Sequence, residues 1–157
     1  ATSVAELYQA GVRASFQERG VSGADSYLAS TGTPAAFADN SGNGRDASAL
    51  STITPQWDDN ASTEQKLERI ITQKYIAIFP DGQEAWSEFR RTGYPKLFTV
   101  DHNASNGAVN TNLQIRRLRF PASEYSNNTA NVQAAVGLLG GPDNGGTKLW
   151  WDKNPKH

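Results

Sequence analysis

A capped amphipathic segment, a short turn and a second helical segment constrain this 157-residue chain more than any other feature. Ser62 and Gln65 have the spacing of a capping box, in which two side chains satisfy the first free backbone amides of a helix. Pro80-Asp81-Gly82 has the residue types of a tight turn, and a second helix is predicted from Gln83 to Arg91. A three-residue link predicts that the two helices pack antiparallel as a hairpin. The apolar face of the first helix is predicted to comprise Leu67, Ile70, Ile71, Tyr75, Ile78 and Phe79.

Two aromatic residues of the second helix are predicted to form the core of this hairpin. Trp86 and Phe89 are three residues apart and therefore share one helical face. That face must meet the preceding helix, so we expect both rings to pack against Tyr75 and Phe79. Trp86 and Phe89 are accordingly assigned structural roles.

The end of the second helix carries two adjacent cations. Gly93 is predicted to end this helix, and Pro95 prevents it from resuming. Arg90 and Arg91 fall in the last turn, where positive charge interacts favourably with the helix dipole and the free carbonyls. We assign both arginines structural roles as well.

Three further helices are predicted elsewhere in the chain. Ser3 and Glu6 form another capping box, which opens a helix that runs to Gly20. A shorter helix is expected at residues 23–29, and another at 130–138.

Long segments between and after these helices have no regular periodicity. Residues 31–60 are rich in Gly, Ser, Asn and Asp and form a long loop, and residues 96–157 are mostly irregular, with 113–120 extended. Loops of this length tend to be functional or mobile. The fold class is therefore mainly α with long irregular loops and little or no sheet, organised as a single domain or fragment over residues 1–157 around a hairpin core at 62–92.

The composition argues against several function classes. There is no cysteine, so disulfide frameworks, thiolate zinc sites and cysteine nucleophiles are excluded for these residues. Fifteen basic residues balance sixteen acidic ones, so no overall field favours nucleic acid or an anionic membrane. We expect no cofactor and no bound nucleic acid.

Two motifs resemble ligand-binding loops but lack a required residue. Residues 39–44 have the oxygen ligands and glycine of the first half of a calcium loop, yet the position that requires a bidentate glutamate is Leu50. A turn is the favoured interpretation, with an incomplete calcium site at 39–50 as the alternative. Residues 141–148 nearly match a phosphate-binding loop, but Thr147 precedes Lys148 in the reverse of the required order. No metal site is assigned.

Evidence for catalysis is weak. Glu84 and Glu88 are four apart on one helical face and would be the acid and base of a glycoside hydrolase, which is an alternative function. Salt-bridged surface glutamates are the favoured interpretation beside Arg90 and Arg91. His102 and His157 have no metal-ligand spacing. We assign no catalytic residue.

Three tryptophans outside the predicted helices are candidate ligand contacts. Trp57, Trp150 and Trp151 neighbour aspartates, and an aromatic face beside polar groups suits the stacking of a sugar ring. The alternative for each ring is that it packs irregular structure onto the helical core.

Four stretches together resemble the C-terminal part of the SusD/RagB family, nutrient-binding lipoproteins of the gram-negative outer membrane. They are LERIITQKYIAIFPDGQEAWSEFRRTGYPKLF, RRLRFPASEYSNNTANVQAA, LLGGPDNGGTKLWWDKNP and, more loosely, AELYQAGVRASFQERG. The resemblance covers most of the chain, and residues 31–60 are the least covered.

The resemblance implies a scaffold of tetratricopeptide-like helical hairpins at the cell surface, anchored by a lipid on a cysteine outside this chain. Members bind glycans or other oligomeric nutrients and hand them to a TonB-dependent, SusC-like transporter; they are binding proteins, not enzymes. In this picture Arg90 and Arg91 tie down the irregular C-terminal segment. A helical protein-interaction scaffold without a small ligand is the other alternative.

Overall fold

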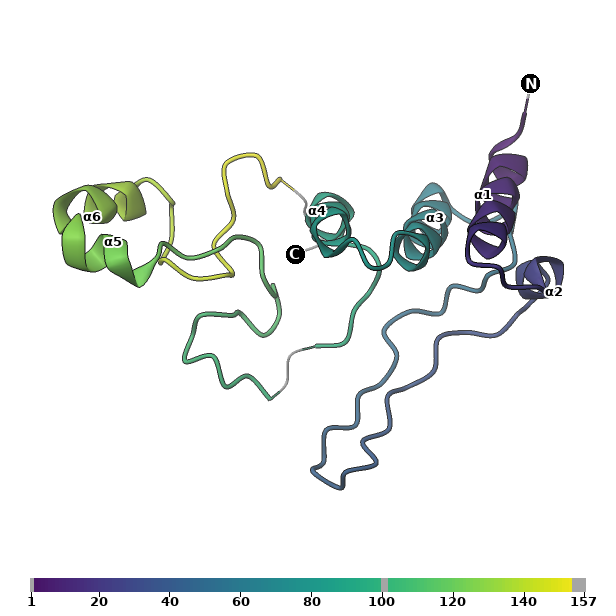
Figure 1. The fold of residues 1–157 in the computed structure, drawn as a ribbon, viewed down its shortest axis with the longest axis horizontal. Helices are drawn as coiled ribbons and strands as arrows, with labels where there is room; N and C mark the ends of the chain where they lie inside the picture. Colours follow the sequence, from purple (N-terminus) through teal and green to yellow (C-terminus); the bar gives the residue numbers. More distant parts are fainter. Residues whose placement is uncertain (1, 100–101, 154–157) are drawn as a thin grey trace. The chain divides into compact units, whose positions relative to one another are not determined.

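A computed structural model describes residues 2–99 and 102–153, and this part of the chain is helical. Its six helices are connected by long irregular segments, and the described residues contain two isolated β-bridges but no β-strand (Figure 1). The expected mainly α fold class is confirmed. The helices are α1 (Val4–Glu18), α2 (Ala24–Leu28), α3 (Thr63–Ala77), α4 (Gly82–Thr92), α5 (Ala122–Asn127) and α6 (Thr129–Gly137).

The contacts divide the chain into two compact units. Unit 1 comprises residues 1–38 and 46–97 and contains α1 to α4; unit 2 comprises residues 39–45 and 98–157 and contains α5 and α6. The organisation of all 157 residues as a single domain stays a prediction.

The helix ends of unit 1 follow the sequence signals closely. Both predicted capping boxes form: Ser3 accepts a hydrogen bond from the backbone of Glu6, and Ser62 accepts one from the backbone of Gln65. Asp81 caps α4, and Gly93 ends α4 in the left-handed region at φ 77°, which glycine adopts without steric cost. The predicted hairpin of α3 and α4 is therefore confirmed.

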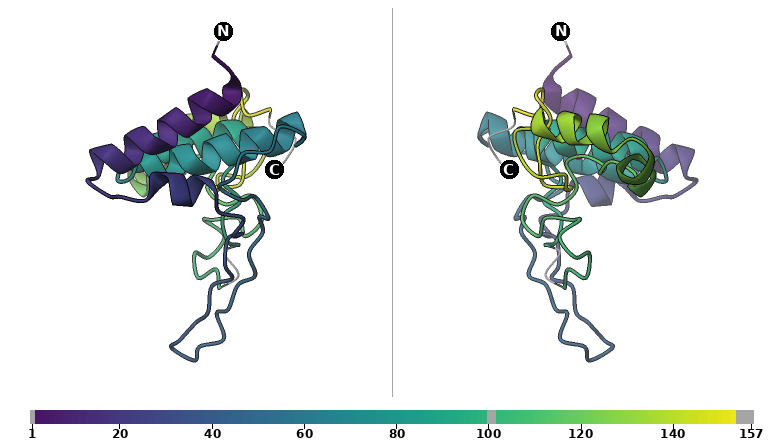
Figure 2. Two further views of the ribbon diagram at one scale, coloured as in Figure 1. Left: turned by 90° about the vertical axis from the view of Figure 1, so that its right-hand side faces the viewer. Right: turned by 90° about the vertical axis from the view of Figure 1, so that its left-hand side faces the viewer.

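The core of unit 1 lies between α1, α2 and α3. Tyr8, Val12 and Leu28 are buried together, and Trp57 and Ile70 are among the partly buried residues packed against them. Figure 2 shows α1 and α3 running alongside each other, and α3 also contacts α4. Burial raises the pKa of Tyr8 to about 12, and its hydroxyl donates a 2.6 Å hydrogen bond to the carbonyl of Pro55.

The predicted apolar face of α3 is wrong at its C-terminal end. Phe79 is 70 % exposed, so it does not pack in the hairpin core as expected, whereas Phe89 is buried. The α3 residues that are buried include two charged ones, Glu68 and Arg69. Their burial is possible because the long loop supplies polar partners: Ser51 donates to Glu68, and the carbonyl of Thr54 accepts from Arg69.

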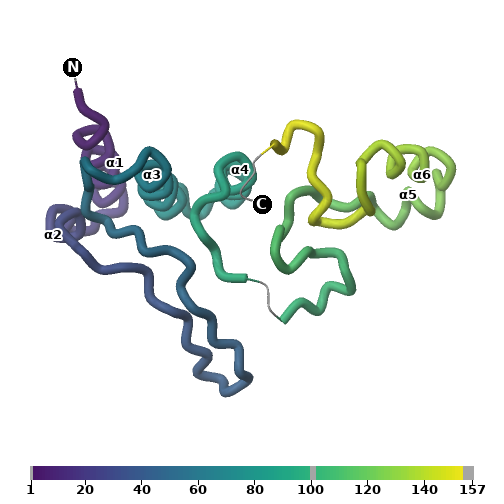
Figure 3. Tube along the Cα trace, turned by 180° about the vertical axis from the view of Figure 1, so that it is seen from behind, coloured from purple at the N-terminus to yellow at the C-terminus, as the bar shows by residue number. Residues whose placement is uncertain are grey.

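The long loop between α2 and α3 is ordered by a few backbone contacts. Phe37 and Ala47 form an antiparallel bridge, and the amide of Gln56 donates to the carbonyl of Ser30. The two arms of the loop therefore run beside each other, as Figure 3 shows. The expected long, partly ordered loop is confirmed.

Unit 2 contains one helix that the sequence analysis missed. We expected one helix at 130–138, and the structure has α6 (Thr129–Gly137) there, preceded by the unpredicted six-residue α5 (Ala122–Asn127), which packs against α6. Helix α5 has no side-chain cap, which explains why no capping signal marked it. Residues 113–120 are irregular, as predicted.

Candidate ligand-binding surfaces

Trp150 is the most exposed of the candidate tryptophans. It lies in a turn in which the amide of Asp152 donates to the carbonyl of Leu149, and 83 % of its surface is accessible. A hollow of about 370 Å³ lies beside it, lined in part by Leu138 and Lys148. Trp151 is in the same turn and is 41 % exposed. The structure thus places two predicted residues together, with an aromatic face open to solvent.

A buried ion pair anchors this turn. Arg116 donates from Nε and Nη2 to the two carboxylate oxygens of Asp152 at 2.8 and 2.9 Å. Both side chains are almost completely inaccessible to water, at 0 % and 1 % exposed. A two-pronged charged contact of this kind fixes geometry as well as charge. The position of the tryptophan turn is therefore set by Arg116.

Asp143 organises the rest of unit 2. Its carboxylate accepts hydrogen bonds from the guanidinium of Arg117, the hydroxyl of Tyr125 and the amide of Phe120. Burial alone would raise the pKa of Asp143, but the hydrogen bonds from Arg117 and Tyr125 outweigh burial and hold that pKa below its ordinary value. The carboxylate is thus kept ionised and joins α5 to the Gly-rich segment.

The segment that resembles a phosphate-binding loop forms a packed turn. The side chain of Asn144 accepts from the amides of Gly146 and Thr147. The amide of Gly145 donates to the carbonyl of Ala108, and its own carbonyl accepts from the amide of Arg116. A Cβ on Gly145 would lie 2.8 Å from the Ala108 carbonyl oxygen, so this close backbone approach requires glycine. The backbone amides are used internally, as expected for a turn.

Trp57 has a different environment from Trp150. It belongs to unit 1, where its ring lies 5.2 Å from that of Tyr8 and its Nε1 donates to Asp59 at 2.8 Å. A polar hollow of about 580 Å³ lies beside the indole, and Arg69 lines it. Within the described chain, the buried Nη1 of Arg69 has no hydrogen-bond acceptor. Trp57 is thus partly buried against the core and has one side on a polar hollow.

Each of the two arginines assigned a structural role in α4 contacts a residue of its own helix. Arg90 lies 3.6 Å from the centre of the Trp86 ring, which is a close cation–π contact. Arg91 pairs with Glu88 at 2.8 Å, one turn earlier. Both arginines are in the last turn of α4 as predicted. That they tie down the C-terminal segment stays a prediction, since the ties described within unit 2 come from Arg116 and Arg117.

Glu84 and Glu88 are held by cations. Lys74 of α3 lies 2.7 Å from Glu84 and 3.5 Å from Glu88. The hydrogen bond from Arg91 lowers the pKa of Glu88, so this carboxyl stays ionised. A glycoside hydrolase needs one carboxyl whose pKa is raised so that it can donate a proton. Glu88 has the opposite environment.

The calcium-like segment uses its carboxylate internally. Asp39 accepts hydrogen bonds from the amides of Ser41 and Arg45 and from the hydroxyl of Ser41. Across residues 2–99 and 102–153, no three His, Asp or Glu side chains cluster so as to hold a metal ion. His102 lies near the carbonyl of Gly44, and His157 lies outside the described residues.

None of the helices in the described part of the chain has both the length and the apolar character needed to cross a bilayer.

The two arginine–aspartate pairs of unit 2 were not predicted from the sequence. Arg116, Arg117, Asp143 and Asp152 are far apart in sequence, and only the fold brings them together. The sequence did contain a signal for these pairs. Arginines in an apolar stretch and aspartates in a Gly-rich segment need partners of opposite charge if they are buried.

Comparison with known proteins gives one consistent result. The family described as SusD-like, "Susd and RagB outer membrane lipoprotein", matches residues 1–152. No curated protein matches the chain.

Several solved structures are similar over the whole chain. A chitin-binding SusD homologue from Flavobacterium johnsoniae is 50 % identical over 100 % of this chain and 33 % of its own, with a TM-score of 0.85. A SusD homologue from Bacteroides vulgatus is 46 % identical over 99 % of this chain and 32 % of its own, with a TM-score of 0.85. One from Bacteroides thetaiotaomicron is 40 % identical over 98 % of this chain and 34 % of its own, also at 0.85.

The chain therefore spans about a third of the length of these solved relatives. With a family match over nearly all of its residues and helical neighbours at this level of identity, the chain belongs to the SusD-like family of outer-membrane lipoproteins.

Proposed function

We propose that this chain is part of a cell-surface protein that captures a glycan, or a similar oligomeric nutrient, and passes it to a TonB-dependent, SusC-like transporter. The observation that carries the proposal is the 50 % identity to a chitin-binding homologue over the whole chain. Membership of an outer-membrane lipoprotein family supports the surface location. Oligomers of N-acetylglucosamine are therefore the first ligands to test.

The exposed tryptophan turn supports this function chemically. A sugar ring has an apolar C–H face and hydroxyls at its edge, so it needs an aromatic surface with polar groups around it. Trp150 offers such a surface, and Lys148 and Lys153 line the adjacent hollow. Trp57 is a secondary candidate, because its ring already packs on Tyr8 and only the polar hollow beside it is open.

Capture without cleavage agrees with the state of the two glutamates. Glu88 is paired with Arg91 and Lys74, and its lowered pKa makes it a poor proton donor at neutral pH. We therefore propose that the chain is not an enzyme.

The test combines binding and turnover in one panel of glycans that includes chitin oligosaccharides. We expect the chain to be retarded in glycan-containing affinity gels while no reducing ends are released. Trp150→Ala should weaken retardation by about tenfold or more, as expected for an aromatic residue that dominates a contact. Leu118→Ala, which changes another exposed apolar residue of unit 2, serves as the matched control. Release of reducing ends that is lost in Glu88→Gln would refute the proposal.

Handover is tested separately. The full-length protein should co-purify with a large outer-membrane barrel protein from membranes. Co-purification with a barrel protein in the absence of any glycan affinity would favour the protein-interaction scaffold instead.

A further inference from the structure

Three Asn-Gly pairs in the chain share one kind of chemical reactivity: Asn43-Gly44, Asn106-Gly107 and Asn144-Gly145. In such a pair the backbone nitrogen of the glycine can attack the side-chain amide carbon of the asparagine, because glycine has no Cβ to hinder the approach. A bond between these two atoms forms, the bond to the side-chain nitrogen breaks, and ammonia leaves a five-membered succinimide ring. Water then opens the ring at either carbonyl, so an aspartate or an isoaspartate replaces the asparagine.

The fold decides how fast each pair reacts. The glycine amide must lose its proton, so an amide that is buried and hydrogen-bonded is protected. The asparagine side chain and the backbone beside it must also rotate into the geometry for attack, which a packed turn prevents. Because the three pairs consist of the same two residues, differences between their rates report on their surroundings.

The Asn144-Gly145 pair has both kinds of protection. Gly145 is buried, and its amide donates a 2.7 Å hydrogen bond to the carbonyl of Ala108. The Oδ1 of Asn144 accepts hydrogen bonds from the amides of Gly146 and Thr147 at 2.9 and 3.1 Å, which fix the side chain. We therefore expect this pair to react slowly.

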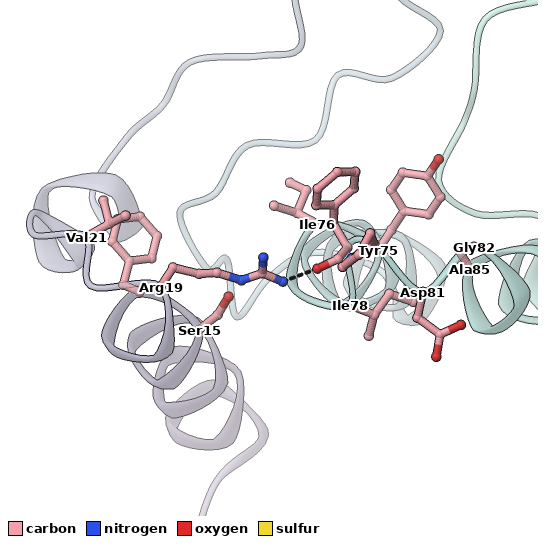
Figure 4. Close-up of a pocket in the computed structure, with 12 residues that line it drawn as sticks. Ser15, Arg19, Val21, Tyr75, Ile76, Ile78, Asp81, Gly82 and Ala85 are labelled. Carbon is pink, nitrogen blue, oxygen red and sulfur yellow. Dashed lines mark hydrogen bonds between the residues drawn. The ribbon is translucent and has the colours of Figure 1, made fainter.

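The related pair Asp81-Gly82 is held in a similar way. An aspartate before a glycine can close the same ring with loss of water. Here the carboxylate of Asp81 accepts from the amide of Glu84, and the amide of Gly82 donates to the carbonyl of Pro80 at 2.9 Å. Figure 4 shows Asp81 and Gly82 at the start of α4. The helix cap thus restrains both reacting groups.

The Asn106-Gly107 pair is exposed but lies in a closed turn. The amide of Ala108 donates to the carbonyl of Ser105 at 3.1 Å, and Asn106 and Gly107 have φ values of 51° and 82°. These consecutive positive φ values are those of a type I′ turn. The turn must open before the side chain of Asn106 can approach the next backbone nitrogen, so we expect an intermediate rate.

The Asn43-Gly44 pair is the least protected. Both residues are exposed in the long loop between α2 and α3. The side chain or carbonyl of Asp39 accepts hydrogen bonds from the neighbouring backbone amides of Ser41, Gly42, Asn43 and Arg45. Among the described residues the amide of Gly44 has no acceptor. The nitrogen that would attack is therefore open to water and to deprotonation.

The backbone and side chain of this pair can also rotate. Gly42 and Gly44 have φ values of 72° and 66°, and glycine moves into and out of this region without steric cost. The Nδ2 of Asn43 donates a 2.6 Å hydrogen bond to Oγ of Ser41, which is exposed, so water can replace it. Neither restraint found at Asn144 is present here.

We propose that Asn43 is a site of spontaneous deamidation, at which the folded chain converts an amide into a carboxylate faster than at its other two Asn-Gly pairs. The change adds one negative charge to a chain whose formal net charge is −1. An isoaspartate product also lengthens the main chain by a methylene next to Gly44, whose carbonyl lies 3.4 Å from Nε2 of His102. Glycan capture plays no part in this inference.

One sample can report on all three pairs, because they lie in different tryptic peptides: 20–45, 97–116 and 120–148. The 157-residue chain is incubated in mildly alkaline buffer, samples are digested at intervals, and mass spectrometry with fragmentation measures the fraction of each asparagine that has become an acid. A parallel incubation in guanidinium chloride is the control, because unfolding removes the differences between the surroundings of the pairs.

We expect conversion in the folded chain to be about tenfold or more faster at Asn43 than at Asn144, with Asn106 between them. In guanidinium chloride the three rates should approach one another. Equal rates in the folded chain, or the fastest conversion at Asn106 or Asn144, would overturn the proposal.

Two variants test the chemistry itself. Gly44→Ala places a Cβ beside the attacking nitrogen, so it should slow conversion at Asn43 severalfold and leave Asn106 unchanged; an unchanged rate at Asn43 would exclude this nitrogen and overturn the proposal. Isoelectric focusing of the unsubstituted chain should show a more acidic form that increases with time. Asn43→Gln should delay that form, because a longer side chain must close a larger ring. An acidic form that appears equally fast in Asn43→Gln would overturn the proposal as well.

Discussion

Unit 1 and unit 2 are ordered by different kinds of interaction. In unit 1, capped amphipathic helices bury an apolar cluster around Tyr8, Val12 and Leu28. Unit 2 has only two short helices, and its irregular segments are held by buried arginine–aspartate pairs and hydrogen-bonded turns. An exposed tryptophan surface can therefore be held on irregular backbone where buried polar contacts replace a helical core.

The largest expected effect comes from removing one partner of the buried pair in unit 2. Arg116→Ala removes both guanidinium hydrogen bonds to the buried carboxylate of Asp152, so we expect a loss of about 3–5 kcal/mol in the free energy of unfolding of unit 2. Hydrogen exchange resolved by peptide should show faster exchange in 102–153 and little change in α1 to α4. Arg119→Ala, at an exposed position, is the control. An equal loss of protection in both units would show that the two units are not stabilised separately.

A smaller effect is expected where backbones approach closely in unit 2. A Cβ on Gly146 would lie 2.6 Å from the Cβ of Asn110, so Gly146→Ala should destabilise unit 2 by about 1–3 kcal/mol. Gly137→Ala is the matched control, because a Cβ on Gly137 would have no neighbour within 4 Å. In α6 that alanine should be neutral or slightly stabilising. Denaturant unfolding of both variants measures the difference, and similar losses would show that steric closeness is not the cause.

Unit 1 should respond to the loss of a helix cap. Ser62→Ala removes the acceptor for the amide of Gln65, and we expect a cost of about 1 kcal/mol. Ser62→Asp retains a capping side chain and should keep most of the stability that Ser62→Ala loses. Urea unfolding followed by circular dichroism measures the free energy of unfolding of each variant. A change in the exchange rates of unit 2 but not of α3 would contradict local capping as the mechanism.

The smallest expected effect is a pH dependence that arises from Asp143. Its contribution to the stability of unit 2 is present at neutral pH and is lost only in acid. Its pKa is lower folded than unfolded, so the folded state binds fewer protons and stability falls as the pH drops below about 4. Exchange of unit 2 should therefore accelerate between about pH 4 and pH 2. Asp143→Asn should flatten this dependence. An unchanged profile in that variant would assign the acid sensitivity to other carboxylates.

The sequence was a good guide to unit 1 for a physical reason. Capping boxes at Ser3 and Ser62 and the glycine at 93 act within a few residues of the structure that they determine, so they can be read locally. Phe79 was wrongly predicted to be buried in the hairpin core. Helical periodicity shows which residues lie on the same face of a helix, but it does not show how far along that face the partner helix extends.

Unit 2 was less predictable because its order depends on distant partners. The pairing of Arg116 with Asp152 spans 36 positions, and that of Arg117 with Asp143 spans 26. No local pattern encodes these partners. The three candidate tryptophans lie outside regular helices, as predicted, and their role as ligand contacts stays a prediction. Only the structure distinguishes exposed Trp150 from Trp57, which packs against the core.

The most direct test of the account is peptide-resolved hydrogen exchange with and without a chitin oligosaccharide. We predict protection in the segment around Trp150 and Trp151, with no change around Glu84 and Glu88 and no product formed. Protection centred on those two glutamates, with release of shorter sugars, would contradict the account.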